Sequence, residues 1–378
     1  MRTIVLSGIN LFRGGTLKIM QDCIAAFSAC SGDEYRIIAL VHNEKQYTKQ
    51  KNVTYFSFSK SRKSWIYRLY YEYIGFKKLS QKWKPYMWFS LHDTTPNVIA
   101  EKRMVYCHNT FSFYHAGIKG LFMQPSIFMF SLFSKYIHKI NIKKNDWVVV
   151  QQEWLRKAFE EMFSIRNIVV ALPVQEQYSS VIVSGQSVFP KNKTVFFYPA
   201  TPMIHKNFEV ICKATLILEK AGISNFEVVL TLDGTENKYS KKIYDKYQSL
   251  NNMRFVGLLK REEVDAYYLS SDCLLFPSKI ESWGLPVTEA KEQGLSILIT
   301  DLPYSKESVG KYDKVKFFEP DNSAQLADDM KKIIQGKITF DKTKVVEYKK
   351  PFTRNWDELV RFLLNEKNEN EDENIAYS

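Results

Sequence analysis

The sequence is poor in cysteine and lacks the spacings with which cysteine builds a site. Five cysteines occur among 378 residues, and no two of them form a Cys-x-x-Cys pair. An odd number of thiols in mostly apolar surroundings does not suggest a disulfide framework, and zinc-finger spacing is missing. We therefore expect buried, reduced cysteines and a cytoplasmic protein.

The sequence also lacks the glycine motifs of two large nucleotide-binding classes. The first expected strand is followed by Ser-Gly-Ile-Asn-Leu-Phe-Arg-Gly-Gly-Thr at residues 7–16. This segment is neither Gly-x-Gly-x-x-Gly nor a Walker A loop, so dinucleotide binding and phosphate-loop NTPase chemistry lose support. The pair Gly14 and Gly15 before a helix still lets the backbone approach a diphosphate, although a plain turn explains it about as well.

No apolar run is long enough for a membrane-spanning helix. The longest candidate, residues 120–134, contains Pro125 and falls short of the roughly 20 residues that a span needs. We expect a core segment here, with an interfacial segment as the alternative. The aromatic and basic stretch at residues 60–89 also has two interpretations. Its side chains either pack in the core or form a surface that faces a membrane or the acceptor.

The net charge of +12 is confined to the first half of the chain. Residues 1–180 carry 25 Lys and Arg against 12 Asp and Glu, whereas residues 181–378 carry 28 against 29. A basic domain attracts nucleic acid, an anionic membrane surface or a phosphorylated acceptor. No zinc-finger, RNA-binding or helix-turn-helix signature is present, so we expect no nucleic-acid partner.

Short β-rich runs alternate with amphipathic helical patterns along almost the whole chain. This alternation predicts an α/β fold with mostly parallel sheets and helices on both faces. A polar stretch near residues 174–193 predicts a boundary between two domains, at residues 1–175 and 193–350. Residues 351–366 are expected to form a last helix, and residues 367–378 an acidic, disordered tail.

Residues 276–290 are the most informative stretch of the chain. They read Phe-Pro-Ser-Lys-Ile-Glu-Ser-Trp-Gly-Leu-Pro-Val-Thr-Glu-Ala, with Glu281 and Glu289 on either side of a glycine turn. A helix N-terminus that follows a glycine turn favours an anion, and Pro286 suits the first helical turn. An isolated Glu-x7-Glu spacing would usually mean an ordinary loop and a solvated helix face.

The surrounding residues resemble the family-4 retaining glycosyltransferases of the GT-B fold. That family carries Phe-Pro-Ser, Glu-Gly-Phe-Gly-Leu-Pro and Glu-Ala in this order, and the resemblance extends over residues 194–335 and more weakly over residues 1–172. It implies two Rossmann-like domains facing each other across a nucleotide-sugar crevice, with the C-terminal helix crossing back to the N-terminal domain. It also implies retention of stereochemistry.

The resemblance assigns roles to residues of this sequence. Glu281 would lie near the donor sugar, and Glu289 would hold the ribose. Lys206 matches the lysine of the family's diphosphate clamp, but Thr201 replaces its arginine, so His205, Arg13 or the helix start near Leu285 would have to compensate. Further donor-binding positions are Gly14, Gly15, Trp283, Gly284 and Leu285.

Polar residues at strand ends supply the remaining candidates. His108 follows an expected strand, and the family places there a histidine that contacts the donor sugar. His92 and Asp93 follow the preceding strand and are candidates for lining the acceptor side. No Asp-x-Asp pair occurs in the chain, and this is the usual carboxylate motif of the metal-dependent glycosyltransferases of the other large fold. We expect no metal and no cofactor other than the nucleotide-sugar co-substrate.

The sequence therefore predicts a glycosyltransferase that transfers a sugar from a nucleotide-diphosphate sugar to a growing glycan. The expected acceptor is lipid-linked and belongs to surface-polysaccharide biosynthesis, and the enzyme would be peripheral to the inner face of the cell membrane. Two alternatives stay open: a GT-B sugar-nucleotide epimerase, and a non-catalytic protein that binds anionic lipid or nucleic acid.

Overall fold

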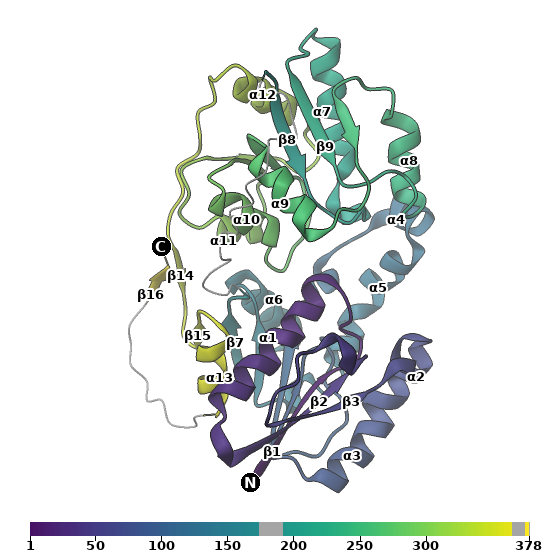
Figure 1. Ribbon diagram of the computed structural model, residues 1–378, viewed down its shortest axis with the longest axis vertical. Helices are drawn as coiled ribbons and strands as arrows, with labels where there is room; N and C mark the ends of the chain where they lie inside the picture. The colour runs from purple at the N-terminus through teal and green to yellow at the C-terminus, as the bar shows by residue number, and fades with distance from the viewer. Residues whose placement is uncertain (174–191, 365–374, 378) are drawn as a thin grey trace. The chain divides into compact units, whose positions relative to one another are not determined.

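The computed structural model of the chain describes residues 1–173, 192–364 and 375–377. The described chain forms two compact units (Figure 1). Unit 1 contains residues 1–112, 133–173, 348–364 and 375, and unit 2 contains residues 113–132, 192–347 and 376–377. The expected connection at residues 174–193 and the expected tail at residues 367–378 lie outside the described residues, apart from residues 192, 193 and 375–377.

Unit 1 is built on an eight-stranded sheet whose pairs are all parallel. The strand order is β15-β7-β6-β5-β4-β1-β2-β3. The strands are β1 (Arg2–Gly8), β2 (Tyr35–Val41), β3 (Val53–Ser57), β4 (Met87–Ser90), β5 (Lys102–Cys107), β6 (Trp147–Val150), β7 (Ile168–Ala171) and β15 (Phe352–Thr353). The central strands are continuous apolar runs, as expected where helices cover both faces of a parallel sheet.

The helices of unit 1 come from both ends of the chain. They are α1 (Gly14–Cys30), α2 (Trp65–Tyr70), α3 (Phe76–Trp83), α6 (Glu153–Phe163) and α13 (Trp356–Leu364), with the short turns η1 (Gly32–Glu34), η2 (Glu44–Gln46), η3 (Ser59–Arg62) and η6 (Ile142–Lys144). A π-helical turn, η4 (Tyr71–Gly75), joins α2 to α3.

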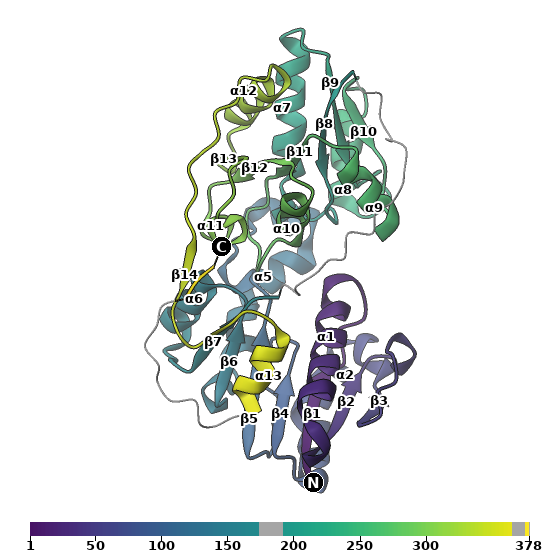
Figure 2. The same cartoon turned by 60° about the vertical axis from the view of Figure 1, so that its left-hand side comes forward.

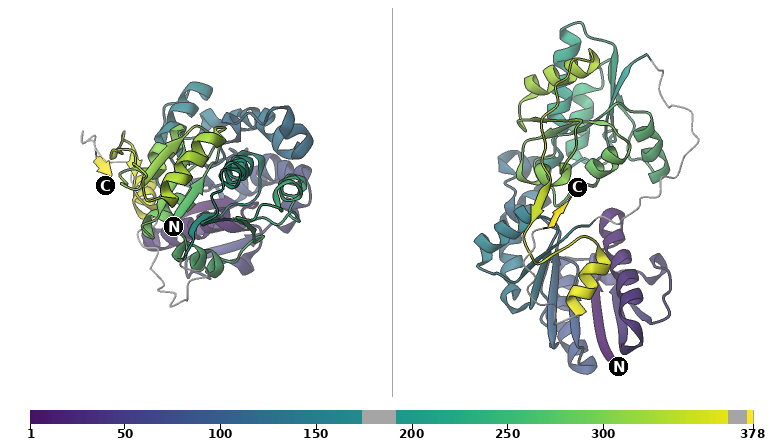
Figure 3. Two further views of the ribbon diagram at one scale, coloured as in Figure 1. Left: turned by 90° about the horizontal axis from the view of Figure 1, so that it is seen from above. Right: turned by 90° about the vertical axis from the view of Figure 1, so that its left-hand side faces the viewer.

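The last helix, α13, belongs to the core of unit 1. Trp356, Leu359, Val360 and Leu363 recur at helical spacing and are all buried in the same apolar cluster as α1 and β1. The Trp356 ring stacks on the ring of Tyr106 from β5, with 5.3 Å between centroids. Figures 2 and 3 both show α13 beside α1. The expected C-terminal helix is thus present and packs on the N-terminal sheet.

Unit 2 repeats the parallel α/β plan with six strands. The order is β10-β9-β8-β11-β12-β13. Its strands are β8 (Thr194–Tyr198), β9 (Phe226–Leu230), β10 (Met253–Phe255), β11 (Cys273–Phe276), β12 (Ser296–Thr300) and β13 (Val315–Phe318). Its helices are η7 (Ile204–Lys206), α7 (Phe208–Lys220), α8 (Lys238–Tyr247), α9 (Arg261–Leu269), α10 (Leu285–Glu292), α11 (Pro303–Val309) and α12 (Ser323–Ile334). A separate two-stranded sheet contains β14 (Val346–Tyr348) and β16 (Ile375–Tyr377).

One segment from the first half of the chain clusters with unit 2. It contains η5 (Phe111–Phe113) in part, α4 (Gly117–Met123) and the start of α5 (Pro125–Lys139). The Gln124 side chain accepts from the Ile204 amide at 2.8 Å and donates to the Pro202 carbonyl at 3.3 Å. The Tyr114 ring meets the His205 ring edge-on. The boundaries expected from the sequence had left this segment in the N-terminal domain.

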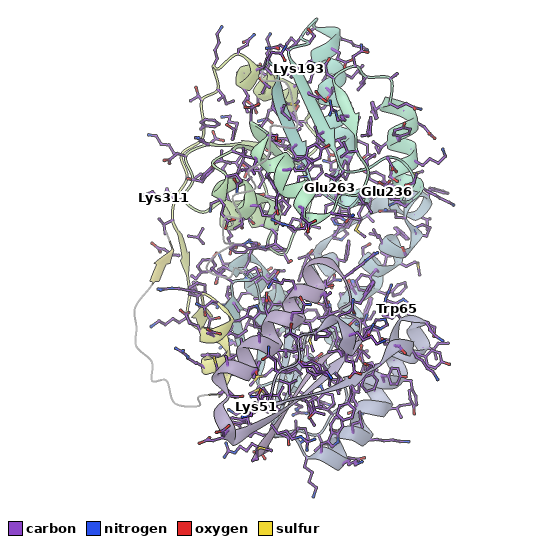
Figure 4. The ribbon with its side chains drawn as sticks, viewed as in Figure 1. Lys51, Trp65, Lys193, Glu236, Glu263 and Lys311 are labelled. Carbon is purple, nitrogen blue, oxygen red and sulfur yellow. The ribbon has the colours of Figure 1, made fainter. Side chains whose placement is uncertain are left out.

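Apolar side chains stand exposed on two stretches of the chain. On α2, Ile66 is 79% exposed, and Trp65, Tyr67, Leu69 and Tyr70 are also exposed; Figure 4 marks Trp65. Within residues 120–134, which cover parts of α4 and α5, five large apolar side chains are exposed: Leu121, Phe122, Met129, Leu132 and Phe133. The expectation of a core segment at residues 120–134 is therefore wrong for these side chains. No helix in the described part of the chain is long and apolar enough to cross a membrane.

Candidate active site

The strand order of each unit fixes where a ligand site can form. In unit 2 the chain runs from β8 outward through β9 to β10, then returns to β11 on the other side of β8 and continues to β12 and β13. The point between β8 and β11 is therefore a topological switch point, and ligands of open α/β sheets bind beyond the carboxyl ends of the strands at such points. In unit 1 the corresponding point lies between β1 and β4.

Lys206 and Glu281 meet at the switch point of unit 2. Lys206 ends η7, which follows β8, and Glu281 lies in the loop between β11 and α10. Lys206 Nζ donates to a carboxylate oxygen of Glu281, and the two side chains are 19% and 14% exposed. A fixed, partly buried ammonium at this position is suited to an anion that develops during a reaction. The sequence predicted both residues, but their contact is visible only in the fold.

A buried tyrosine holds the Lys206 and Glu281 loops together. The Tyr198 hydroxyl at the end of β8 donates to the Lys206 carbonyl at 2.9 Å and lies 3.0 Å from Ser278 Oγ. The Ser278 carbonyl in turn accepts from Thr300 and Tyr304 hydroxyls at 2.8 and 2.7 Å. Sequence analysis missed Tyr198 as a site residue because it read as one more aromatic residue in an apolar strand.

Glu289 is paired with an arginine that sequence analysis also missed. Glu289 is buried on α10, and Arg261, the first residue of α9, donates to its carboxylate. Burial alone would lower the pKa of Arg261, but the carboxylates of Glu289 and Asp265 raise it above its usual value. The one sequence signal for Arg261 was its place shortly after β10, at the sheet edge that also carries Lys206. Figure 4 labels Glu236 and Glu263, which lie at the same end of unit 2 as the carboxyl ends of its strands.

The glycine turn before α10 is a tightly packed structure. Gly284 has a φ of +87°, and a Cβ there would lie 3.2 Å from the Phe276 ring. The neighbouring Trp283 is 6% exposed, and its indole nitrogen donates to Thr288 Oγ1 at 3.0 Å. Leu285 begins α10. The indole of Trp283 therefore supports the turn. At the helix start Pro286 has no N–H, and the Val287 amide donates to the Gly284 carbonyl at 2.8 Å, so the helix dipole rather than a row of open amides is what favours an anion here.

Thr201 was expected to stand where the family carries an arginine, with His205 or the start of α10 as candidates in this unit to supply the positive charge. Thr201 is exposed in the loop after β8. His205 is buried, and burial together with the neighbouring Lys206 charge holds its pKa well below the usual value. A neutral, buried imidazole does not supply the positive charge of an arginine. Within unit 2 this leaves Lys206 and the start of α10 as the groups that favour an anion.

The switch point of unit 1 carries the other predicted residues. Gly14 and Gly15 begin α1 directly after the loop that follows β1, and both are exposed. Gly14 has a φ of +55°, which favours glycine. Among the described residues no side chain caps this helix start, so its first amides are open to an anion.

Asp93 and His108 come together beyond β4 and β5. One Asp93 carboxylate oxygen accepts from the amides of His108 and Asn109 at 2.7 and 2.8 Å. The other lies 3.6 Å from His108 Nε2. His92 is nearby in sequence but its side chain is fully buried, so it does not line an accessible surface as an acceptor contact requires.

In the described ranges no three His, Cys, Asp or Glu side chains gather in a group that could hold a metal ion.

Comparison with known proteins identifies the fold. Residues 181–350 match the family model described as "Glycosyl transferases group 1". A curated relative, an uncharacterized 41.2 kDa protein in the cps region of Klebsiella pneumoniae, is 21% identical over 175 residues, which is 44% of this chain and 46% of that protein. The chain thus spans less than half the length of that relative.

Solved structures resemble the chain over most of its length. WaaG, a glycosyltransferase involved in lipopolysaccharide biosynthesis, superposes with a TM-score of 0.62 over 96% of this chain and 95% of its own, at 14% identity. HepE from Anabaena, in complex with UDP-glucose, gives 0.56 over 89% and 90%, at 12% identity. At such identities the likeness shows the fold alone. The chain has the two parallel-sheet, Rossmann-like α/β units of the GT-B glycosyltransferases.

Proposed function

We propose that this chain is a glycosyltransferase that moves a sugar from a nucleotide-diphosphate sugar to a growing glycan. The observation that carries the proposal is the Lys206–Glu281 ion pair at the switch point of unit 2. It lies inside residues 181–350, which match the group 1 glycosyltransferase family. The UDP-glucose bound to HepE, a protein of similar fold, supports a nucleotide-sugar donor.

The chemistry follows from charge development on the donor. When the bond between the sugar and the diphosphate breaks, negative charge grows on the leaving phosphate, and a preorganised cation lowers the barrier. Lys206 supplies that cation, and Glu281 keeps its ammonium in place before the donor arrives. The start of α10 adds the partial positive charge of its helix dipole.

The remaining residues take the roles that the family resemblance gives them. Glu289, oriented by Arg261, accepts from the ribose hydroxyls. His108, held beside Asp93, faces the donor sugar. Retention of configuration at the sugar carbon and independence of a metal ion are part of the proposal.

The acceptor is proposed to be a lipid-linked glycan of surface-polysaccharide biosynthesis, with the protein peripheral to the membrane. Support comes from the relative in the cps region and from the likeness to WaaG. The charge of residues 1–180 and the exposed apolar side chains of α2 support contact with an anionic membrane surface.

The test is a thermal-unfolding panel of UDP, GDP, CDP and dTDP, each with and without EDTA. A nucleotide present at about 100 times its dissociation constant stabilises the folded state by about 2 to 3 kcal/mol. We expect one nucleotide to do so, with no effect of EDTA. Lys206→Met removes the clamp charge and should abolish the shift. Lys220→Met, at an exposed lysine in the last turn of α7, is the matched control and should keep it.

The same variants separate the proposal from a non-catalytic lipid-binding protein. Phosphatidylglycerol vesicles should bind the wild type and Lys206→Met equally, because the mutation lies outside the basic half of the chain. If no nucleotide shifts unfolding, or if Lys206→Met keeps the full shift, the proposed function is wrong. If vesicle binding depends on Lys206, the assignment of the membrane surface to the N-terminal half is wrong.

A further inference from the structure

A carboxylate that the proposed site does not use is buried in unit 1. Glu72 lies in the π-helical turn η4 and is 1% exposed. Burying a carboxylate is costly unless charged or hydrogen-bonded partners compensate. Burial alone would raise the pKa of Glu72, but His92 and Arg68 hold it at about 2. The chain therefore keeps a buried negative charge at this position, together with the partners that stabilise it.

Both carboxylate oxygens of Glu72 are engaged. Arg68 Nε donates to Oε1 at 2.7 Å, and His92 Nδ1 lies 3.2 Å from the same oxygen. The Thr94 hydroxyl donates to Oε2 at 2.5 Å. Arg68 also donates from Nη2 to the His92 carbonyl at 3.1 Å. Glu72 and Arg68 thus bind His92 and Thr94 in the loop that follows β4.

The hydrogen bonds determine which nitrogen of His92 carries a proton. The Thr94 hydroxyl gives its hydrogen to Glu72, so it can only accept at its 3.0 Å contact with His92 Nδ1. Nδ1 is therefore the protonated nitrogen. Nε2 is buried and has no hydrogen-bond partner among the residues that the structure describes. The hydrogen bonds that orient this ring therefore all lie on its Nδ1 side, at Glu72 and Thr94.

Asp93 lies between the two residues that Glu72 contacts. Its φ of +68° is in the left-handed region, which costs a non-glycine residue about 1 kcal/mol or more. Such a conformation persists only where the neighbours fix it. Asp93 in turn accepts from the His108 and Asn109 amides and lies beside the His108 ring.

We propose that Glu72 is a positioning residue of this protein, which fixes His92 and Thr94 on both sides of Asp93 and thereby orients His108. The role in catalysis rests on the proposed function, in which His108 faces the donor sugar. The orientation of His108 itself is a property of unit 1 and can be measured without any substrate.

The experiment observes the six histidine rings by NMR of protein labelled with ¹⁵N-histidine, with His108→Ala assigning the His108 signals. Glu72→Gln keeps the size of the side chain and removes its charge. We expect the ring signals of His108 to shift or broaden in this variant. Glu153→Gln removes another buried carboxylate of unit 1, which pairs with Arg156 at 3.1 Å, and should leave the His108 signals unchanged.

A milder pair of variants keeps the test decisive if Glu72→Gln does not fold. Thr94→Val removes the hydroxyl that bridges Glu72 and His92, whereas Thr94→Ser retains it. We expect Thr94→Val to perturb the His108 signals and Thr94→Ser to restore them. Unchanged His108 signals in the folded Glu72→Gln and Thr94→Val proteins would overturn the inference.

Turnover supplies the second measurement, with UDP-glucose hydrolysis as the probe. Displacing a reacting group by about 1 Å costs roughly 100-fold in rate, so we expect kcat to fall about 10- to 100-fold in Glu72→Gln while KM changes about threefold or less. An unchanged kcat with altered His108 signals would remove the catalytic part of the inference. Failure of the proposed function can be told apart from failure of this inference. In that case no nucleotide would shift the thermal unfolding of the wild-type protein.

Discussion

At the scale of single residues, the site depends on contacts between side chains far apart in the sequence. The family resemblance assigned roles to Lys206 and Glu281, whereas it named neither Tyr198 nor Arg261. Both missed residues act by holding a predicted residue in place, and nothing in their own neighbourhood marks that task. Tyr198 is fully buried, and burial raises the pKa of its hydroxyl well above the usual value, so the hydroxyl remains a donor throughout the physiological pH range.

Removing that hydroxyl should destabilise unit 2 and disturb the proposed diphosphate-binding position of Lys206. Tyr198→Phe leaves the Lys206 carbonyl and the Ser278 hydroxyl without their shared partner, which costs about 1 to 3 kcal/mol. Urea unfolding would measure the loss, and the nucleotide-induced shift should weaken in the same variant. Tyr70→Phe, at an exposed tyrosine of α2, is the control and should change neither. Equal stability of wild type and Tyr198→Phe would contradict the role assigned to the hydroxyl.

At the scale of elements, patterning predicted the alternation of strands and helices and the parallel sheets that both units show. The apolar pattern of the sequence was less informative about burial where a segment is amphipathic. The apolar stretch at residues 120–134 looked like core, but α4 and α5 leave Phe122 and Phe133 exposed. The π-helical turn η4 was not predicted from the sequence.

The turn that begins α10 offers a test at this scale. Gly284→Ala combines an unfavourable positive φ with a Cβ 3.2 Å from the Phe276 ring, so we expect a loss of about 2 kcal/mol or more in the free energy of unfolding. Gly294→Ala is matched, because Gly294 also has a positive φ but open space around it; it should cost about 1 kcal/mol. Thermal unfolding compares the two. Equal losses would mean that the Phe276 contact is unimportant.

At the scale of the whole molecule, the two units are not two halves of the sequence. The last helix, α13, completes the core of unit 1, and residues 113–132 cluster with unit 2. A contact between chain segments so distant in sequence is set by which apolar faces remain uncovered after each sheet has formed. The family resemblance predicted the return of the last helix, but no local pattern predicted the transfer of residues 113–132.

The contribution of α13 to unit 1 can be measured directly. Leu359 is 1% exposed in the unit 1 core, and Leu359→Ala should cost about 2 to 5 kcal/mol through lost burial and the cavity left behind. Leu258→Ala, at a leucine 62% exposed in unit 2, should cost less than about 0.5 kcal/mol. Urea denaturation of both variants gives the comparison. A small loss for Leu359→Ala would mean that α13 is only loosely attached.

The sequence by itself predicted the alternation of strands and helices and the parallel sheets, and its resemblance to a known family singled out Lys206, Glu281 and Glu289. These properties are local, because neighbouring residues determine the periodicity of strands and helices and form the turn motif. Only the tertiary structure decided that Lys206 pairs with Glu281, that Arg261 pairs with Glu289, and that Glu72 grips the loop beside Asp93. Each of these contacts joins different elements, so its partners are fixed by strand order and helix packing rather than by sequence distance.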